Sequence, residues 1–87
     1  WKLRIIYVLA FHETLRYGEL KRLLTPITHK MLSTQLKELE KDGLINRKEY
    51  QQIPPKVEYS LTQMGKDLQP VVHEIHNWIL QYDIQSN

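Results

Sequence analysis

Apolar positions recur along the chain with a spacing that changes from helical to strand-like and back. Residues 2–11 are mostly apolar and contain no helix breaker, which fits a buried helix or a strand, and the later helical segments favour a helix. Residues 15–17 read as a short strand. Leucines then recur at helical spacing within residues 18–24 and predict a short helix, which Thr25 and Pro26 end because the residue before a proline avoids the α conformation.

Residues 28–42 predict the second helix of a helix-turn-helix. Thr28 suits the N-cap, and Gly43 stands where a glycine commonly follows a helix. Only a few residues separate this helix from the one before it, which is helix–short turn–helix spacing. With about 100° of rotation per residue, the leucines fall on one side together with Met31 and Gln35, while the opposite side carries lysines and small hydroxyls.

Two strands and a loop follow this helix. Residues 44–51 alternate in part between apolar and polar positions, and residues 56–61, KVEYSL, alternate cleanly. The segment between them, QQIPP, contains two prolines, which cannot donate ladder hydrogen bonds. The pattern therefore predicts a β-hairpin with a proline-rich tip.

A long last helix is expected from a cap at Thr62 to about Asp83, with Gly65 and Pro70 making its first turns irregular or bent. Its apolar stripe is too large for a thin domain to cover, and an exposed apolar patch usually marks a protein interface. The expected dimer-interface residues are Leu68, Val71, Val72, Ile75, Trp78, Ile79 and Tyr82.

The predicted fold is α+β and mostly α: a winged helix-turn-helix with a three-helix core, a β-hairpin wing and a long C-terminal helix. The 87 residues suffice for one domain, 1–87, in which 62–87 would form the dimerisation helix. A chain of this size buries roughly 60% of its unfolded surface, so a second subunit would stabilise its thin core.

Charge adds a hint about the partner. The formal net charge is only +2, but residues 1–61 hold eleven basic and seven acidic side chains, whereas residues 62–87 hold one and three. A basic body with an acidic tail suits a polyanion partner, although an uneven solvated surface accounts for the charge equally well.

The polar face of the 28–42 helix carries the candidate chemistry. Lysines attract phosphate or bond to guanine, and serine and threonine are short enough to let a helix enter the major groove. The helix N-terminus adds backbone N–H groups suited to phosphate. An ordinary amphipathic surface helix is the alternative, and three acids on the same helix favour it. The candidate DNA contacts here are Thr28, His29, Lys30, Ser33, Thr34, Lys37 and Lys41.

Three further cations are candidate DNA contacts. Arg47 and Lys56 flank the hairpin loop, so the wing tip is expected to touch phosphate or enter the minor groove, against the alternative of a solvated hairpin. Arg16 either binds phosphate or pairs with Glu19 or Glu58.

Several motifs resemble the HxlR-type family of winged helix-turn-helix transcription regulators. They are WK with the apolar helix after it, RYGEL, THKMLSTQLKELEKDGLI and, most specifically, PPKVEYSLTQMG. The resemblance covers nearly the whole chain and implies dimeric, DNA-binding regulators of bacterial and archaeal genes. Two features depart from the family pattern. Thr25 and Pro26 stand where members usually carry Pro-Gly, and there is no cysteine of the kind that some members use to sense oxidants or aldehydes.

Other classes of function find little support. With no cysteine and no apolar run near 18 residues, neither a thiolate metal site nor a membrane span is expected, and the cytoplasm is the expected location. His73 and His76 have a permitted metal spacing but no third ligand, and they are expected on a solvated face. No catalytic constellation is found, so we expect neither an enzyme nor a cofactor, and no effector is indicated. The remaining alternative is a protein-interaction module, which would more often place apolar or aromatic anchors where the lysines lie.

Overall fold

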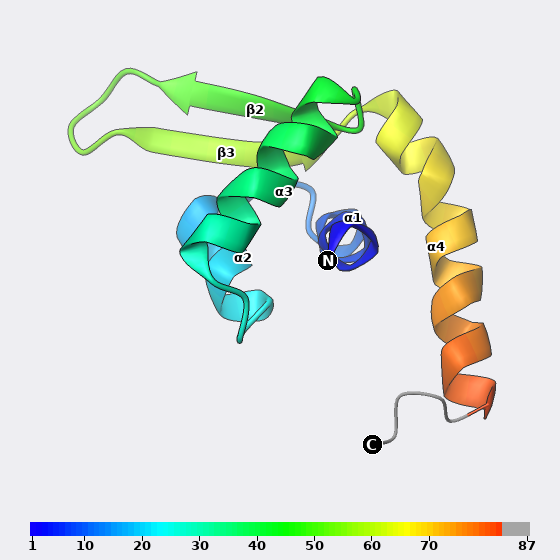
Figure 1. Ribbon diagram of the computed structural model, residues 1–87. Coiled ribbons are helices and arrows are strands. Elements are labelled where there is room, and N and C mark those ends of the chain that lie inside the picture. Colours follow the sequence, from blue (N-terminus) through cyan, green and yellow to red (C-terminus); the bar gives the residue numbers. More distant parts are fainter. Residues whose placement is uncertain (83–87) are drawn as a thin grey trace.

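The structure, a computed structural model, describes residues 1–82 (Figure 1). The elements are α1 (Lys2–Phe11), β1 (Leu15–Arg16), α2 (Tyr17–Leu23), α3 (His29–Lys41), β2 (Ile45–Tyr50), β3 (Lys56–Leu61) and α4 (Gln63–Tyr82). This order of helices and strands confirms the winged helix-turn-helix predicted from the sequence. The predicted end of the last helix at Asp83 lies outside the described residues.

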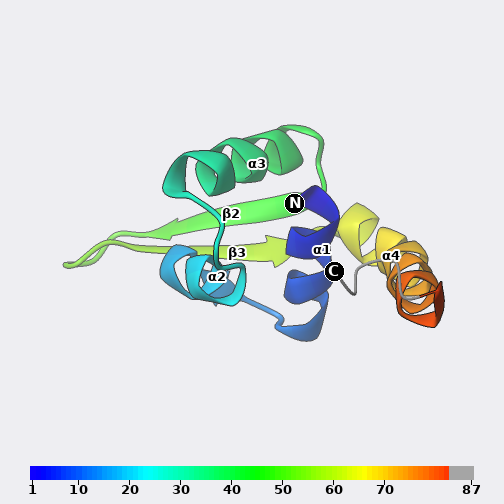
Figure 2. The ribbon, with the colours of Figure 1, turned by 60° about the horizontal axis from the view of Figure 1, so that its bottom comes forward.

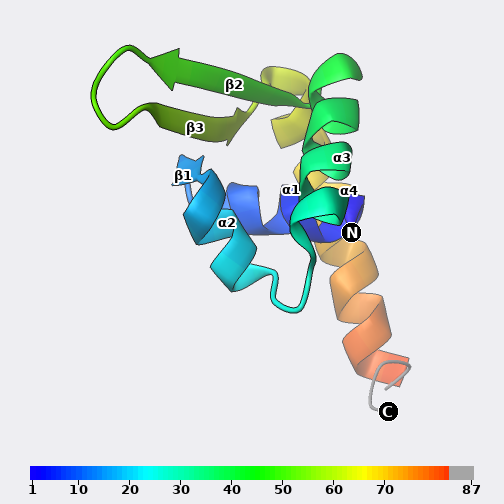
Figure 3. The same cartoon turned by 60° about the vertical axis from the view of Figure 1, so that its left-hand side comes forward.

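The three strands form one antiparallel sheet in the order β1-β3-β2. The hairpin of β2 and β3 projects beyond the helices as a wing (Figures 1 and 3). In β3 the predicted alternation is confirmed, because Tyr59 and Leu61 are buried and Val57 packs against the core. Cross-strand pairing places Tyr59 opposite Leu15 on one side and Arg47 on the other.

The core draws side chains from all seven elements. Leucines of α2 and α3 pack on isoleucines of α1 and on the helix-facing side of the sheet, while the wing beyond the core is exposed. The buried apolar residues are Ile5, Ile6, Leu9, Leu15, Leu20, Leu24, Ile27, Leu32, Leu36, Leu39, Ile45, Tyr59, Leu61 and Val72.

A compact junction joins α3, the sheet and α4. Gly43 follows α3 with a φ of 79°, in the left-handed region that favours glycine. The Thr62 hydroxyl donates to the Gly43 carbonyl at 2.6 Å and accepts the Gly65 N–H at 3.1 Å, so one side chain caps α4 and ties it to the end of α3. The predicted cap at Thr62 is confirmed.

From this junction α4 runs away from the wing alongside α1 (Figures 1 and 2). It is one helix from Gln63 to Tyr82 with Pro70 inside it, and its first turns lie at an angle to the rest, which agrees with the bend expected from Gly65 and Pro70 (Figure 1). Pro70 is exposed, and the Lys66 carbonyl that loses its helical partner there belongs to an equally exposed residue that water can reach.

Candidate nucleic-acid interface

Helix α3 is oriented as its sequence predicts. The Thr28 hydroxyl accepts the Met31 N–H at 3.1 Å, which confirms the N-cap. Leu32, Leu36 and Leu39 are buried, and the opposite side of the helix is exposed. The exposed residues on that side are Lys30, Thr34, Lys37 and Lys41, which we call the lysine face.

The acids of α3 do not lie in the middle of the lysine face. Glu38 forms an ion pair with Lys2 of α1 at 2.6 Å, and this hydrogen bond raises the pKa of Lys2 above its usual value. Glu40 lies near the opposite edge, where it lines a cleft beside the hairpin. Two of the three acids that favour an ordinary surface helix therefore lie at the edges of the lysine face, and the third, Asp42, is the C-cap that follows the helix.

The apolar side of α3 is narrower than predicted. Met31 is 41% exposed, and its sulfur accepts a hydrogen bond from the Gln35 amide at 3.6 Å. Ser33, expected beside the lysines, is half-buried instead, and its hydroxyl lies 3.2 Å from that of Tyr17.

Tyr17 connects α2 to the first turn of α3. Its ring stacks on that of His29, with centroids 5.8 Å apart and 9° between the planes. The Tyr17 hydroxyl lies 3.1 Å from Nδ1 of His29 and donates to the His29 carbonyl at 3.2 Å. Sequence reasoning missed this residue, because RYGEL was noted only as a motif of the resemblance and nothing indicated what its tyrosine contacts.

The two predicted wing cations lie on different faces of the hairpin. Arg47 faces α3, and its guanidinium bonds to Glu49 at 2.6 Å. This bond, with a smaller contribution from the neighbouring Tyr59, raises the pKa of Arg47. Arg47 is the third residue of β2, so it lies on a strand of the wing and not in the loop at its tip. Lys56 does adjoin the loop, and its ammonium lies over the Tyr50 ring, 4.7 Å from the centroid.

Arg16 lies at the edge of the sheet. Its Cα pairs across the strands with Glu58, and its backbone N–H donates to the Glu19 carboxylate at 2.8 Å. A hydrogen bond from Tyr50, followed by the contact with Lys56 at 3.4 Å and the charge of Arg16, lowers the pKa of Glu58 below its ordinary 4.5. Among residues 1–82 the Arg16 guanidinium forms no ion pair with Glu19 or Glu58, so its two predicted roles, binding phosphate and pairing with an acid, stay predictions.

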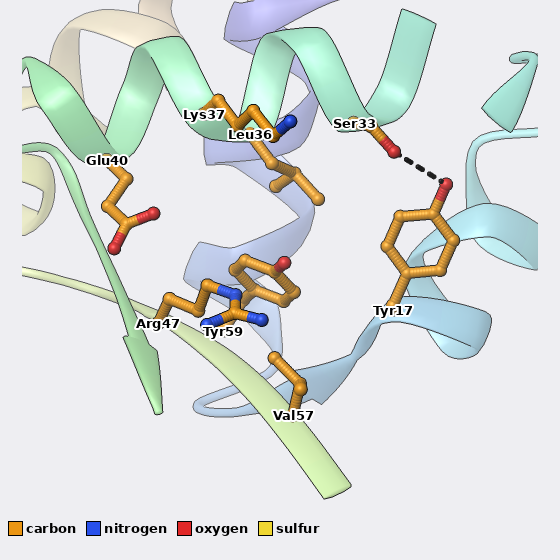
Figure 4. A pocket seen from close by; sticks show the side chains of 8 residues that line it. All are labelled: Tyr17, Ser33, Leu36, Lys37, Glu40, Arg47, Val57 and Tyr59. Atoms are coloured by element: carbon orange, nitrogen blue, oxygen red, sulfur yellow. Dashed lines mark hydrogen bonds between the residues drawn. The ribbon is translucent and has the colours of Figure 1, made fainter. Parts of the chain in front are cut away.

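A cleft of about 520 Å³ opens between α3 and the hairpin (Figure 4). Lys37 and Glu40 come to it from α3 and Arg47 from β2, and the guanidinium lies beside the Tyr59 ring (Figure 4). The lining residues are Tyr17, Ser33, Leu36, Lys37, Glu40, Arg47, Val57 and Tyr59.

An apolar groove of about 580 Å³ lies between α1 and α4. The predicted stripe of α4 is only partly covered there: Val72 is buried and Leu68 and Ile79 are half-buried. The exposed members of the stripe are Val71, Ile75, Trp78 and Tyr82. The α1 side of the groove is lined by Leu3, Arg4, Tyr7 and Val8.

The solvated position expected for His76 is wrong. His76 is half-buried in this groove, and its ring stacks on Tyr7 with centroids 4.7 Å apart. His73 is exposed, as predicted, although its ring also lies 6.5 Å from that of Tyr7. A helical projection places residues relative to their own helix, and it carries no information about the Tyr7 ring that α1 brings alongside.

Within residues 1–82, no three His, Cys, Asp or Glu side chains gather where they would hold a metal ion. No helix in this part of the chain is long and apolar enough to cross a membrane.

Comparisons with known proteins agree with this architecture. The profile of the HxlR-like helix-turn-helix family matches residues 1–87. The uncharacterized HTH-type transcriptional regulator YdzF of Bacillus subtilis (strain 168) is 56% identical over 78 residues, which cover 90% of this chain and 72% of YdzF.

Two solved structures are also similar. A putative HTH-type transcriptional regulator, ytcD, superposes with a TM-score of 0.89 at 45% identity and covers 98% of this chain and 86% of its own. A putative transcriptional regulator described as MarR family, from Porphyromonas gingivalis W83, gives a TM-score of 0.87 at 44% identity, over 92% and 78% of the two chains. The chain therefore belongs to the HxlR-like helix-turn-helix family, whose matched members are transcription regulators rather than enzymes.

Proposed function

We propose that this chain is a sequence-specific regulator that binds double-stranded DNA as a homodimer. The observation that carries the proposal is the division of α3, whose leucines are buried while the lysine face is exposed at the edge of the fold. A helix anchored on one side and cationic on the other has the form of a recognition helix in the major groove. Family membership supports the same reading, and the cytoplasm is the corresponding location.

Each predicted contact has a role in this arrangement. Lys30, Thr34, Lys37 and Lys41 meet base edges or phosphates along the groove, and Thr28 and His29 lie at the helix N-terminus, where backbone N–H groups favour phosphate. Ser33 is engaged with Tyr17, so we assign it to orienting the helix more than to DNA. On the wing, Lys56 adjoins the tip and reaches flanking backbone.

The apolar groove supports the homodimer. Trp78 and Tyr82 are 52% and 59% exposed, a large apolar area for a soluble subunit to leave in water. Pairing α4 and α1 with a second copy covers this area, and the two α3 helices then read half-sites about one helical turn apart. A protein-interaction module without DNA binding is the competing function, but the lysine face carries no aromatic anchor of the kind that such modules use.

The salt dependence of binding tests the proposal. A dimer that neutralises about six phosphates gives a log–log slope of affinity against salt near −5. Fluorescence anisotropy with a selected DNA duplex measures this slope. An affinity that does not change with salt, or no binding at low salt, contradicts the proposal.

A further inference from the structure

The cleft between α3 and the hairpin is lined by cations from two different elements. These cations are Lys37 from α3 and Arg47 from β2 (Figure 4). The Tyr17 hydroxyl at the edge of the cleft is already engaged, because it donates to the His29 carbonyl. The cleft volume of about 520 Å³ is ample for one phosphate group. Lys37 also belongs to the lysine face, whereas Arg47 lies outside both that face and the apolar groove.

Arg47 is already held in place before any ligand arrives. Glu49 bonds to one terminal nitrogen of its guanidinium at 2.6 Å, and the guanidinium lies beside the buried Tyr59 ring (Figure 4). A guanidinium has five N–H donors, so the bond to Glu49 leaves donors for a further acceptor. Because the side chain is fixed in advance, a ligand loses less free energy to ordering it.

The acidic residues at the cleft favour an anion of low charge. Glu40 lines the cleft, and Glu49 lies on Arg47, so the two cations are largely balanced and the net local charge is near zero. A free phosphate dianion gains little electrostatic energy at such a site. A singly charged phosphodiester is repelled less by the two carboxylates. A phosphodiester of DNA is also brought to the cleft by every other contact of the duplex.

We propose that the cleft binds one backbone phosphodiester of DNA in each half-site, held by Arg47 and Lys37. The proposal rests on the function proposed above. With α3 in the major groove and the hairpin reaching the flanking backbone, the DNA strand that borders the groove passes between these two elements. The cleft lies between the same two elements (Figure 4). Arg47 thus positions the protein on the duplex and reads no base.

Arg47→Ala and Lys48→Ala form a matched pair for the test. The two cations are neighbours in β2 but lie on opposite faces, because Lys48 packs over Tyr50. We expect Arg47→Ala to weaken binding of a selected duplex by about tenfold or more, the range for a hydrogen bond to a charged group. We also expect the salt slope to become less steep by about 0.9 per protomer. Lys48→Ala should change both quantities much less.

Neutral methylphosphonate substitutions locate the contact. Replacing one particular phosphate in each half-site should weaken the native protein and leave Arg47→Ala unaffected, while substitutions elsewhere weaken both proteins alike. If no single phosphate is coupled to Arg47 in this way while the native protein still binds its duplex, the cleft proposal is overturned and the proposed function stands. If Arg47→Ala is unfolded by circular dichroism, Arg47→Lys replaces it, and it should show the same coupling at a smaller magnitude because the fork is lost.

A free anion, such as inorganic phosphate, is the alternative ligand for the cleft. Inorganic phosphate at millimolar concentration, added without DNA at constant ionic strength, should leave the tyrosine and arginine NMR signals of the cleft unchanged. Saturable shifts that vanish in Arg47→Ala would assign the cleft to a free anion and overturn the phosphodiester proposal.

Discussion

Replacing Gly65 with alanine would place a methyl group against a backbone oxygen, whereas the same change at Gly18 meets no atom. A Cβ at Gly65 would lie 2.3 Å from the Leu44 carbonyl oxygen and 3.1 Å from Cδ2 of Leu61. That carbonyl also accepts the Thr62 N–H at 3.1 Å, within the junction that joins α3, the sheet and α4. At Gly18 nothing lies within 4 Å of the added Cβ.

The magnitudes follow from these distances. The contact at Gly65 must open by about 0.7 Å to reach the 3.0 Å that Cβ atoms tolerate, and a backbone oxygen cannot yield without disturbing the cap of α4. Overpacking of this kind costs about 3 kcal/mol, and replacing a helical glycine returns about 1 kcal/mol. We expect Gly65→Ala to lower the free energy of unfolding by about 2 kcal/mol and Tm by about 8–16 °C. Gly18→Ala should raise stability by about 0.5–1 kcal/mol.

Thermal unfolding followed by circular dichroism, at one protomer concentration for all proteins, measures both changes. Gly65→Ala should also weaken DNA binding beyond its effect on folding, because α4 and α3 meet at this junction and the dimer fixes the spacing of the two α3 helices. A Gly65→Ala protein as stable as the native one would refute the packing described for the junction. The decisive result is a loss of stability in Gly65→Ala together with a gain of stability in Gly18→Ala.

The remaining predictions concern the lysine face, the dimer and one carboxylate. Lys30→Ala and Lys37→Ala should weaken DNA binding with Tm unchanged. Loss of a base contact should cost roughly 1–3 kcal/mol and relax specificity at one position, whereas loss of a phosphate contact should weaken binding to all sequences equally. If anisotropy shows normal binding by both variants, α3 is not the recognition helix. Ile75→Glu with Ile79→Glu should halve the mass seen by analytical ultracentrifugation at micromolar concentration, and a native protein that is already monomeric contradicts the dimer. Because the folded pKa of Glu58 is lowered, its charge stabilises the fold above about pH 4.5, and this stabilisation disappears as the pH falls through the folded pKa. In urea titrations, Glu58→Gln should therefore be less stable than the native protein at pH 7 and equally stable at low pH.

The helices and strands and their buried faces can be predicted from local sequence patterns. Leucines at helical spacing orient α3, the alternation of KVEYSL orients β3, and Thr28 and Thr62 cap their helices through hydrogen bonds that close within three residues. Such features depend on one element at a time, so a projection along that element predicts them.

The contacts that shape the candidate site join residues far apart in the chain. Tyr17 meets Ser33 sixteen residues later, and the position of Arg47 beside Tyr59 depends on the register of the hairpin. His76 stacks on Tyr7 only because α4 returns alongside α1. Periodicity gives the direction of a side chain relative to its own element, but which neighbour lies in that direction is decided by the packing of the whole fold.

Selection of bound fragments from a random pool of duplex DNA tests the central claim most directly, because it measures sequence-specific binding and identifies the site together. The account predicts enrichment of one motif with two-fold symmetry, whose half-sites lie about 10 base pairs apart, centre to centre. A pool that retains no preferred sequence after repeated rounds at low salt would contradict it.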